Sequence, residues 1–171
     1  MSYGEITARM VKILRPLVAG KVVVDFGAGD CSKAATIKAL GASRVLAVDK
    51  APMPPTDGIE QVVGYFAELG DEVPPEYDVA FVSWPQNYYQ PNGLALLAER
   101  AKVIVYLGSN TDGNACGYRD LFLHMLTRTL EAHVPHRRNT LIAVGEFTGR
   151  MRKPTWEEKA ALSDKLLNFR A

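Results

Sequence analysis

The ten residues Val22–Cys31, Val-Val-Val-Asp-Phe-Gly-Ala-Gly-Asp-Cys, constrain the fold of this chain more than any other stretch. A run of β-branched residues that ends in a glycine-rich turn and leads into a helical pattern is typical of a β-α-β unit. Gly27 and Gly29 carry no Cβ atom that would hold a ligand away from the turn, and the following helix offers unpaired backbone N–H groups. The stretch therefore predicts a nucleotide-binding turn.

A carboxylate follows at the distance that a nucleotide site requires. The apolar stretch Arg44–Asp49 predicts a second strand that ends in Asp49. In β-α-β nucleotide sites, an acidic residue about 20 positions after the glycines accepts hydrogen bonds from ribose hydroxyls. The glycine turn and Asp49 together are the strongest functional signal in the sequence.

The composition narrows the class of protein. The chain has 171 residues, 47% of them apolar and 23% charged, which predicts a single globular domain over residues 1–171. A formal net charge of +1 gives no global field for indiscriminate binding to nucleic acid or membranes. The charged residues before Val22 interrupt any apolar region of a secretory signal, and no stretch is long enough to span a bilayer. We therefore expect a cytoplasmic protein with no membrane partner.

Periodicity and turn signals predict the remaining elements. Lead-in residues 1–20 contain a helix over Glu5–Leu17, closed by Pro16 and Gly20. A hairpin of two antiparallel strands precedes a C-terminal helix over residues 154–169, so the sheet is mixed. The expected strands are Val22–Phe26, Arg44–Asp49, Ile59–Phe66, Tyr77–Trp84, Lys102–Leu107, His133–Arg137 and Thr140–Phe147, and the other helices are Cys31–Leu40, Leu94–Ala101 and Tyr118–Ala132.

This order of elements, together with the turn Asp25–Cys31, resembles the class I (Rossmann-like) S-adenosylmethionine-dependent methyltransferases. The resemblance covers nearly the whole chain, and Cys31 stands where the family usually has the last glycine of its motif. It implies an α/β Rossmann-like methyltransferase sandwich, with a mostly parallel seven-stranded sheet, an antiparallel terminal hairpin and helices on both faces.

The resemblance also implies S-adenosyl-L-methionine as the cofactor. The family's glycine turn lies against the methionine and ribose portions, the acidic residue binds both ribose hydroxyls, and the end of the third strand contacts adenine. The residues carried over as cofactor contacts are Asp25, Gly27, Ala28, Gly29, Asp30, Asp49, Lys50, Tyr65, Phe66 and Ser83. Structural alternatives stay open for Asp25 and Asp30 as carboxylates that bond to loop or helix-start N–H groups, and for Tyr65 and Phe66 as core residues.

The fourth strand ends in Ser83-Trp84-Pro85-Gln86, which resembles a degenerate form of the Asp/Asn/Ser-Pro-Pro-aromatic motif of methyltransferases that modify amino nitrogens. The hydroxyl of Ser83 and the carbonyl of Trp84 would hold the hydrogens of an acceptor nitrogen, while the ring of Trp84, Tyr88 or Tyr89 stacks on the substrate. The expected catalytic residues are Ser83, Trp84 and Pro85, and the expected substrate-binding residues are Tyr88, Tyr89 and Asn110.

These patterns predict methyl transfer to a small molecule, leaning to a nitrogen atom, with nucleic acid or protein as alternative acceptors and homo-oligomerisation open. A cofactor-binding regulatory or assembly module without catalysis is the second hypothesis. A nicotinamide-dependent oxidoreductase is the third, although Ser32 stands where the dinucleotide fingerprint has its last glycine. No metal is expected, because no acidic or cysteine partners accompany His133 and His136.

Overall fold

The computed structural model describes residues 6–84, 94, 97–98, 100–109, 130–133 and 140–146, and the fold is given for these. Helix α1 (Ala8–Val18) precedes the first strand, and helix α2 (Ser32–Ala39) lies between the first and second strands. A short 3-10 helix, η1 (Phe66–Glu68), follows the third strand. The strands are β1 (Val22–Phe26), β2 (Arg44–Asp49), β3 (Glu60–Val63), β4 (Tyr77–Ser83), β5 (Ala101–Ser109), β6 (Leu130–His133) and β7 (Thr140–Glu146).

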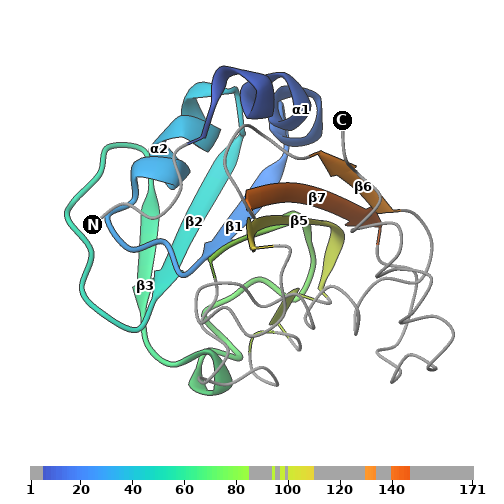
Figure 1. Cartoon of the computed structure of the whole chain (residues 1–171). Helices are drawn as coiled ribbons and strands as arrows, with labels where there is room; N and C mark the ends of the chain where they lie inside the picture. The colour runs from blue at the N-terminus through green and yellow to red at the C-terminus, as the bar shows by residue number, and fades with distance from the viewer. Residues whose placement is uncertain are drawn as a thin grey trace, which may run out of the picture.

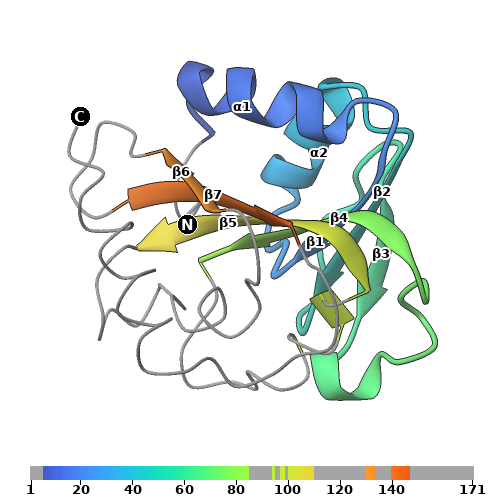
Figure 2. The same cartoon turned by 90° about the vertical axis from the view of Figure 1, so that its right-hand side faces the viewer.

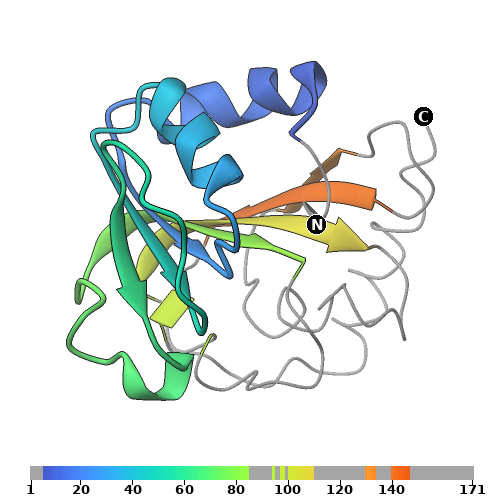
Figure 3. The same ribbon diagram turned by 90° about the vertical axis from the view of Figure 1, so that its left-hand side faces the viewer.

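Five strands form a parallel sheet in the order β3-β2-β1-β4-β5. β7 pairs with β5 and β6 pairs with β7, both in the antiparallel sense. The chain runs outward from β1 to β3, then crosses to β4 on the other side of β1 (Figure 3). This reversal between β1 and β4 is the point at which open α/β sheets bind ligands, outside the carboxyl ends of their strands. It places the glycine turn, which follows β1, at the expected position of a ligand.

Helices α1 and α2 cover the same face of the sheet, as Figures 1 and 2 show, whereas the helical residues Leu94, Leu97 and Ala98 belong to the core of the other face. Strand residues alternate between this face and the other, so the sheet has a core on each side. The helix-side core joins α1 and α2 to β1, β4 and β5 through Met10, Leu14, Val18, Val23, Ala34, Ile37, Val79, Phe81, Val105 and Leu107, among others. The opposite core contains Val24, Phe26, Leu46, Val48, Ala80, Val82, Ile104 and Tyr106 from the strands, with Leu94, Leu97 and Ala98.

The lead-in helix differs from its expected end. Thr7 caps α1 by accepting a hydrogen bond from the N–H of Met10 at 3.3 Å. Pro16 was expected to close the helix, but it lies inside α1, which continues to Val18. The missing N–H of Pro16 costs one helical bond, while the buried side chains of Leu14 and Val18 hold the last turn against the sheet.

The third strand is shorter than expected. β3 ends at Val63, whereas the sequence predicted a strand through Phe66. The backbone turns at Gly64, whose N–H donates to the carbonyl of Asp49 at 2.9 Å. A Cβ atom at Gly64 would approach Leu69 Cδ2 to 2.7 Å, so a larger residue here would require the Leu69 side chain to shift. Tyr65 and Phe66 therefore leave the strand and enter η1.

Two further boundaries shift. β6 covers Leu130–His133, so the expected helix over residues 118–132 is wrong for 130–132, and the expected strand over 133–137 begins three residues earlier. The strand has only four residues, Leu-Glu-Ala-His, and periodicity does not distinguish a helix from a strand in so short a segment. The C-terminal helix over 154–169 lies outside the described residues. No helix in the described part of the chain is long and apolar enough to cross a membrane.

Candidate functional site

The glycine turn is fixed to the neighbouring strand by backbone bonds. The N–H groups of Gly27 and Ala28 donate to the carbonyl of Val48 in β2, at 2.8 and 3.2 Å. Gly27 has φ 75° and Gly29 has φ 56°, a region that side chains rarely adopt. A Cβ atom at Gly29 would meet nothing within 4 Å, so the turn leaves open space at this position.

Hydrogen bonds from the glycine turn and from the loop after β2 hold the side chain of Asp49 in place. Its Oδ2 accepts from the N–H of Gly29 at 2.9 Å, and its Oδ1 accepts from the N–H of Ala51 at 3.0 Å. A carboxylate oxygen has two acceptor positions, so each oxygen retains one. Asp49 is therefore oriented beside the glycine turn with an acceptor free on each oxygen, as two adjacent hydroxyls require.

Asp25 lies in β1 on the helix-covered face and is fully buried, at 0% exposure. Neither of its carboxylate oxygens has a hydrogen-bond partner among the described residues. Burial raises the pKa of Asp25 to about 7; Lys33 lowers it, while Asp49 and Asp30 raise it further. The structure excludes the alternative in which Asp25 bonds to loop N–H groups of the described chain. A buried, unpaired carboxylate with a raised pKa is typical of a functional site.

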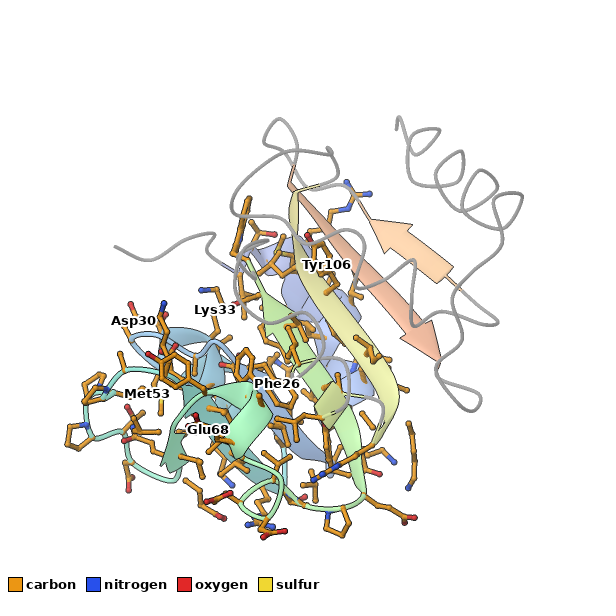
Figure 4. The ribbon with its side chains drawn as sticks, turned by 90° about the horizontal axis from the view of Figure 1, so that it is seen from below. Phe26, Asp30, Lys33, Met53, Glu68 and Tyr106 are labelled. Atoms are coloured by element: carbon orange, nitrogen blue, oxygen red, sulfur yellow. The ribbon has the colours of Figure 1, made fainter. Side chains whose placement is uncertain are left out.

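Asp30 contrasts with Asp25, because its oxygen Oδ1 is engaged. It accepts from the N–H of Ser32 at 3.0 Å and from Ser32 Oγ at 2.6 Å, and these bonds lower the pKa of Asp30. The side chain therefore serves as the helix-start acceptor that the sequence left open. Figure 4 shows it beside Lys33 at the beginning of α2.

Cys31 takes the left-handed backbone conformation, with φ 59° and ψ 8°. This conformation explains why glycine is usual at this position of the family motif, and it costs a non-glycine residue about 1–2 kcal/mol. The buried thiol accepts from Gln61 Nε2 at 3.5 Å, and the same amide donates to the carbonyl of Pro54 at 2.6 Å. Gln61 thus ties the proline-rich loop after β2 to the glycine turn.

Comparison with known proteins settles the fold. In sequence, the chain matches no protein-family model and no curated protein. In structure, it resembles the Burkholderia thailandensis 1,6-didemethyltoxoflavin-N1-methyltransferase with bound 1,6-didemethyltoxoflavin and S-adenosylhomocysteine. The two are 17% identical, with 81% of this chain and 78% of that chain covered and a TM-score of 0.58.

Two further solved structures agree. M. capricolum TrmK, in complex with the cofactor product S-adenosylhomocysteine, is 9% identical, with 91% and 75% of the chains covered and a TM-score of 0.59. The Haloferax volcanii methyltransferase bound to the Trm112 activator is 16% identical, with 85% and 90% covered and a TM-score of 0.60. The chain has the fold of the class I S-adenosylmethionine-dependent methyltransferases.

In this methyltransferase fold, the expected adenine contacts occupy different environments. Tyr65 is 52% exposed at the carboxyl end of β3, and the side chain of Lys50 is exposed directly after Asp49. Phe66 packs against the core opposite the helices, where its ring makes an edge-to-face contact with Phe26 at 5.6 Å between centroids. Phe66 is thus partly buried against the core, whereas Tyr65 is exposed, and the cofactor contacts expected of both residues stay predictions.

Ser83 lies next to the glycine turn. It is 6% exposed at the end of β4, and its carbonyl would be 3.9 Å from a Cβ atom at Gly27. Trp84 follows with φ 48°, a strained conformation for a bulky residue, and its N–H donates to the carbonyl of Leu107 at 2.7 Å. The Trp84 ring packs against the helix-side core, and its Nε1 is buried without a partner among the described residues.

The remaining predicted site residues, Pro85, Tyr88, Tyr89 and Asn110, lie outside the described residues. Within the described part of the chain, no group of three or more histidine, cysteine, aspartate and glutamate side chains could hold a metal ion.

The sequence analysis missed Lys33. This lysine is 9% exposed and lies on the first turn of α2, near Asp25 and Asp30. Its position four residues before the buried Ile37 was the available signal, because residues i and i+4 share a helix face. The carbon chain of a lysine that lies on the apolar face of a helix is buried together with that face.

Proposed function

We propose that this protein binds S-adenosyl-L-methionine at the carboxyl ends of β1, β2 and β4 and transfers its methyl group to an acceptor. One observation carries the proposal: Asp49 is bonded to the glycine turn through Gly29 and retains an acceptor on each oxygen. These acceptors suit the two hydroxyls of a ribose. The fold, shared with methyltransferases that were solved with S-adenosylhomocysteine, supports the same cofactor.

The residues of the site fit the other parts of the cofactor. Asp25 offers a buried, unpaired carboxylate to an ammonium group, and Gly27, Ala28 and Gly29 allow close approach to the turn. Tyr65 is accessible for stacking on adenine, with Lys50 beside Asp49. Asp30 supports the site indirectly, because its bonds to Ser32 fix the start of α2.

When bound, S-adenosylmethionine supplies an electrophilic methyl group. The protein's task is alignment of the acceptor. The backbone of Ser83 lies beside the glycine turn, which supports assigning its hydroxyl and the carbonyl of Trp84 to hold the hydrogens of an acceptor nitrogen. Because the Trp84 ring packs against the helix-side core, we assign the stacking role to Tyr88 or Tyr89, with Pro85 shaping the corner and Asn110 contacting the substrate.

The acceptor in this proposal is a small molecule methylated on nitrogen, with RNA or protein as the alternatives. The proposal also comprises a single domain over residues 1–171, a cytoplasmic location, and the full methyltransferase sandwich of seven strands with a terminal hairpin and helices on both faces. The antiparallel pairing of β6 with β7 supports this architecture, and the connection between them lies outside the described residues.

Isothermal titration with S-adenosylmethionine and S-adenosylhomocysteine tests the proposal. We expect one binding site and weaker binding of NADH, because Ser32 replaces the last glycine of the dinucleotide fingerprint. Absence of binding at high micromolar cofactor would overturn the proposal. Tritium transfer from labelled S-adenosylmethionine to metabolite, RNA and protein fractions then identifies the acceptor class.

A second candidate is a cofactor-binding module without catalysis. The packing of the Trp84 ring against the core favours it, because that ring does not stand free to stack on a substrate. Substituting Ser83→Ala separates the two candidates: a catalyst loses turnover and keeps its affinity for S-adenosylhomocysteine. A protein with no turnover on any acceptor fraction is the module.

A further inference from the structure

Helix α1 carries a row of three exposed basic side chains. Arg9, Lys12 and Arg15 follow one another at intervals of three residues, and all three are exposed. Residues three apart on a helix are neighbours on its surface. None of the three forms a hydrogen bond or an ion pair with another described residue. This row is termed the α1 basic face.

The α1 basic face is unfavourable for the helix on its own. α1 contains no acidic residue that would separate or pair these cations. Like charges three residues apart destabilise a helix, and Arg9, in the first turn, also opposes the helix dipole. An anionic partner bound along the row removes both penalties.

Charge is separated between the two faces of the sheet. α2, which covers the same face as α1, contains two lysines and no acidic residue. Residues 66–76, whose buried apolar residues belong to the core opposite the helices, contain no basic residue. Their acidic residues, Glu68, Asp71, Glu72 and Glu76, are all exposed. Figure 1 shows η1, where this acidic segment begins, on the far side of the sheet from α1. The net charge of +1 thus combines a basic helix layer with an acidic segment on the opposite face.

The apolar side of α1 is not available to a partner. Met10, Leu14 and Val18 are 1%, 0% and 0% exposed, because they pack into the core between the helices and the sheet. A helix that binds a membrane surface needs a free apolar face. The α1 basic face offers cations without apolar surface, which suits a chain of regularly spaced anions such as the phosphates of a nucleic acid.

The direction of α1 connects its basic face with the candidate site. Three residues join the end of α1 to the start of β1, so the last turn of the helix lies near the amino ends of the strands. Figure 2 shows the first turn of α1 on the side toward which β5 points. A strand bound along the row from Arg15 to Arg9 therefore runs toward the carboxyl ends, where Asp49 and Ser83 lie.

We propose that the α1 basic face binds the phosphate backbone of RNA and directs that strand to the methyl-transfer site. This inference rests on the proposed function and deepens it, because it favours RNA over the other acceptors named there. Contacts to phosphates position a strand and carry no sequence information. Arg9, Lys12 and Arg15 thus determine affinity for RNA, and they leave the choice of the methylated base to the residues of the site.

Fluorescence anisotropy of the full chain with a labelled single-stranded RNA tests the inference. The triple variant Arg9→Gln/Lys12→Gln/Arg15→Gln removes the row. For single strands, the logarithm of affinity falls with the logarithm of salt by about 0.7 per phosphate contact, so the triple variant's slope is expected to be smaller by about two. Between about 50 and 200 mM salt, wild-type affinity then falls about 20-fold more than that of the variant. Equal slopes would overturn the inference.

Lys102→Gln is the matched control for the single variant Lys12→Gln. Lys102 is exposed and alternates along β5 with Ile104 and Tyr106, so it lies on the face opposite the helices. Lys12→Gln is expected to lower the salt slope by about 0.7, and Lys102→Gln to leave it unchanged. An equal effect of both variants would mean that overall charge alone drives binding, which contradicts a defined surface.

Two further probes separate possible partners. DNA of the same sequence carries the same phosphates, so its binding is expected to weaken equally in the triple variant, and tritium transfer from labelled S-adenosylmethionine shows which strand is the acceptor. In that assay the triple variant is expected to raise the KM for RNA by about 10-fold or more and to keep kcat within about twofold. Vesicles of phosphatidylserine and phosphatidylcholine test a membrane instead. Loss of vesicle binding in the triple variant without loss of RNA binding would overturn the inference.

Calorimetry with S-adenosylhomocysteine distinguishes this inference from the proposed function. The triple variant is expected to bind this ligand within about twofold of wild type, because none of its three residues belongs to the proposed cofactor site. This binding also shows that the variant is folded, and Lys12→Gln alone carries the test if the triple variant fails the check. Wild-type protein that binds S-adenosylhomocysteine but no RNA would overturn the inference and leave the proposed function standing. Wild-type protein that binds no S-adenosylhomocysteine overturns the proposed function, which is a distinct result.

Discussion

The two edges of the sheet are built in opposite ways. At the amino ends of the strands, Asp78 accepts from the N–H of Val22 at 2.9 Å and pairs with Lys102 at 3.0 Å. Arg44 forms a two-point ion pair with Glu60, and Arg100 donates to the carbonyls of Gly70 and Val73. Each of these charged groups has a partner within the chain.

At the carboxyl ends, the described residues leave polar groups unpaired and backbone strained. Both oxygens of Asp25 and Trp84 Nε1 are buried without hydrogen-bond partners among the described residues, and Cys31 and Trp84 have positive φ. Unpaired buried groups and strained residues cost stability and persist where function requires them. The comparison assigns stability to the amino ends of the strands (the amino edge) and ligand binding to their carboxyl ends (the carboxyl edge). Variants at each edge test this assignment.

The largest expected effect is on binding through Asp49. Asp49→Ala removes acceptors for two ribose hydroxyls, each bond to a charged group contributing about 1.5–3 kcal/mol, so S-adenosylhomocysteine affinity falls by about 100-fold or more. Calorimetry on the folded variant measures it. Asp49→Asn keeps one oxygen acceptor and is expected to be intermediate. Unchanged affinity in Asp49→Ala would remove the carboxyl edge as the ribose site.

The second-largest expected effect is a pH dependence of the free energy of unfolding, caused by Asp25. Its pKa is raised from 3.8 to about 7 in the folded state, so the folded protein binds a proton more tightly than the unfolded chain. Stability from this group is complete below about pH 4 and is lost as pH rises through 7. Between pH 5 and 8 the loss is roughly 2–3 kcal/mol in the free energy of unfolding.

Asp25→Asn is expected to remove this loss, so the variant unfolds at higher urea concentration than wild type at pH 8 and shows little pH dependence above pH 5. Urea denaturation at both pH values measures it, with Asp30→Asn as the exposed control. A wild-type stability that stays constant between pH 5 and 8 would show that Asp25 is ionised and paired throughout.

Asp78→Ala tests the amino edge. It leaves the N–H of Val22 without its acceptor and removes the ion pair with Lys102, so the free energy of unfolding falls by about 1–2 kcal/mol. Affinity for S-adenosylhomocysteine stays within about twofold of wild type, because the change is remote from the carboxyl ends. A fall in the free energy of binding that exceeds the fall in the free energy of unfolding would contradict the assignment of separate roles to the two edges.

The smallest effect is at Arg44, whose side chain is 46% exposed in its pair with Glu60. Exposed ion pairs contribute about 0–1 kcal/mol. Arg44→Ala is therefore expected to change the urea midpoint only slightly and ligand affinity not at all. A destabilisation as large as that of Asp78→Ala would show that the pair fixes the edge strand β3.

The sequence predicted the local parts of this site well. The glycine turn, β1, β2 and the position of Asp49 follow from spacing within 28 residues of one chain segment, Val22–Asp49. The resemblance predicted a mostly parallel sheet, whereas the order of its strands came from the structure. These features depend on backbone geometry, which glycines and β-branched residues determine directly.

The burial and hydrogen bonding of the polar groups at the carboxyl edge could not be predicted in the same way. The burial of Lys33, the absence of partners for Asp25 and the packing of Trp84 depend on how helices and loops cover the sheet. Phe66 and Tyr65 are adjacent in sequence, yet Phe66 is partly buried against the core and Tyr65 is exposed, because the chain bends at Gly64. Such distinctions require the three-dimensional structure.

A crystal structure of the protein with S-adenosylhomocysteine tests the central claim most directly. The account predicts the ribose hydroxyls on Asp49 and the ammonium on Asp25, both at the carboxyl ends of the strands. Ligand bound at the amino edge, or at the carboxyl edge without contact to Asp49, would contradict it.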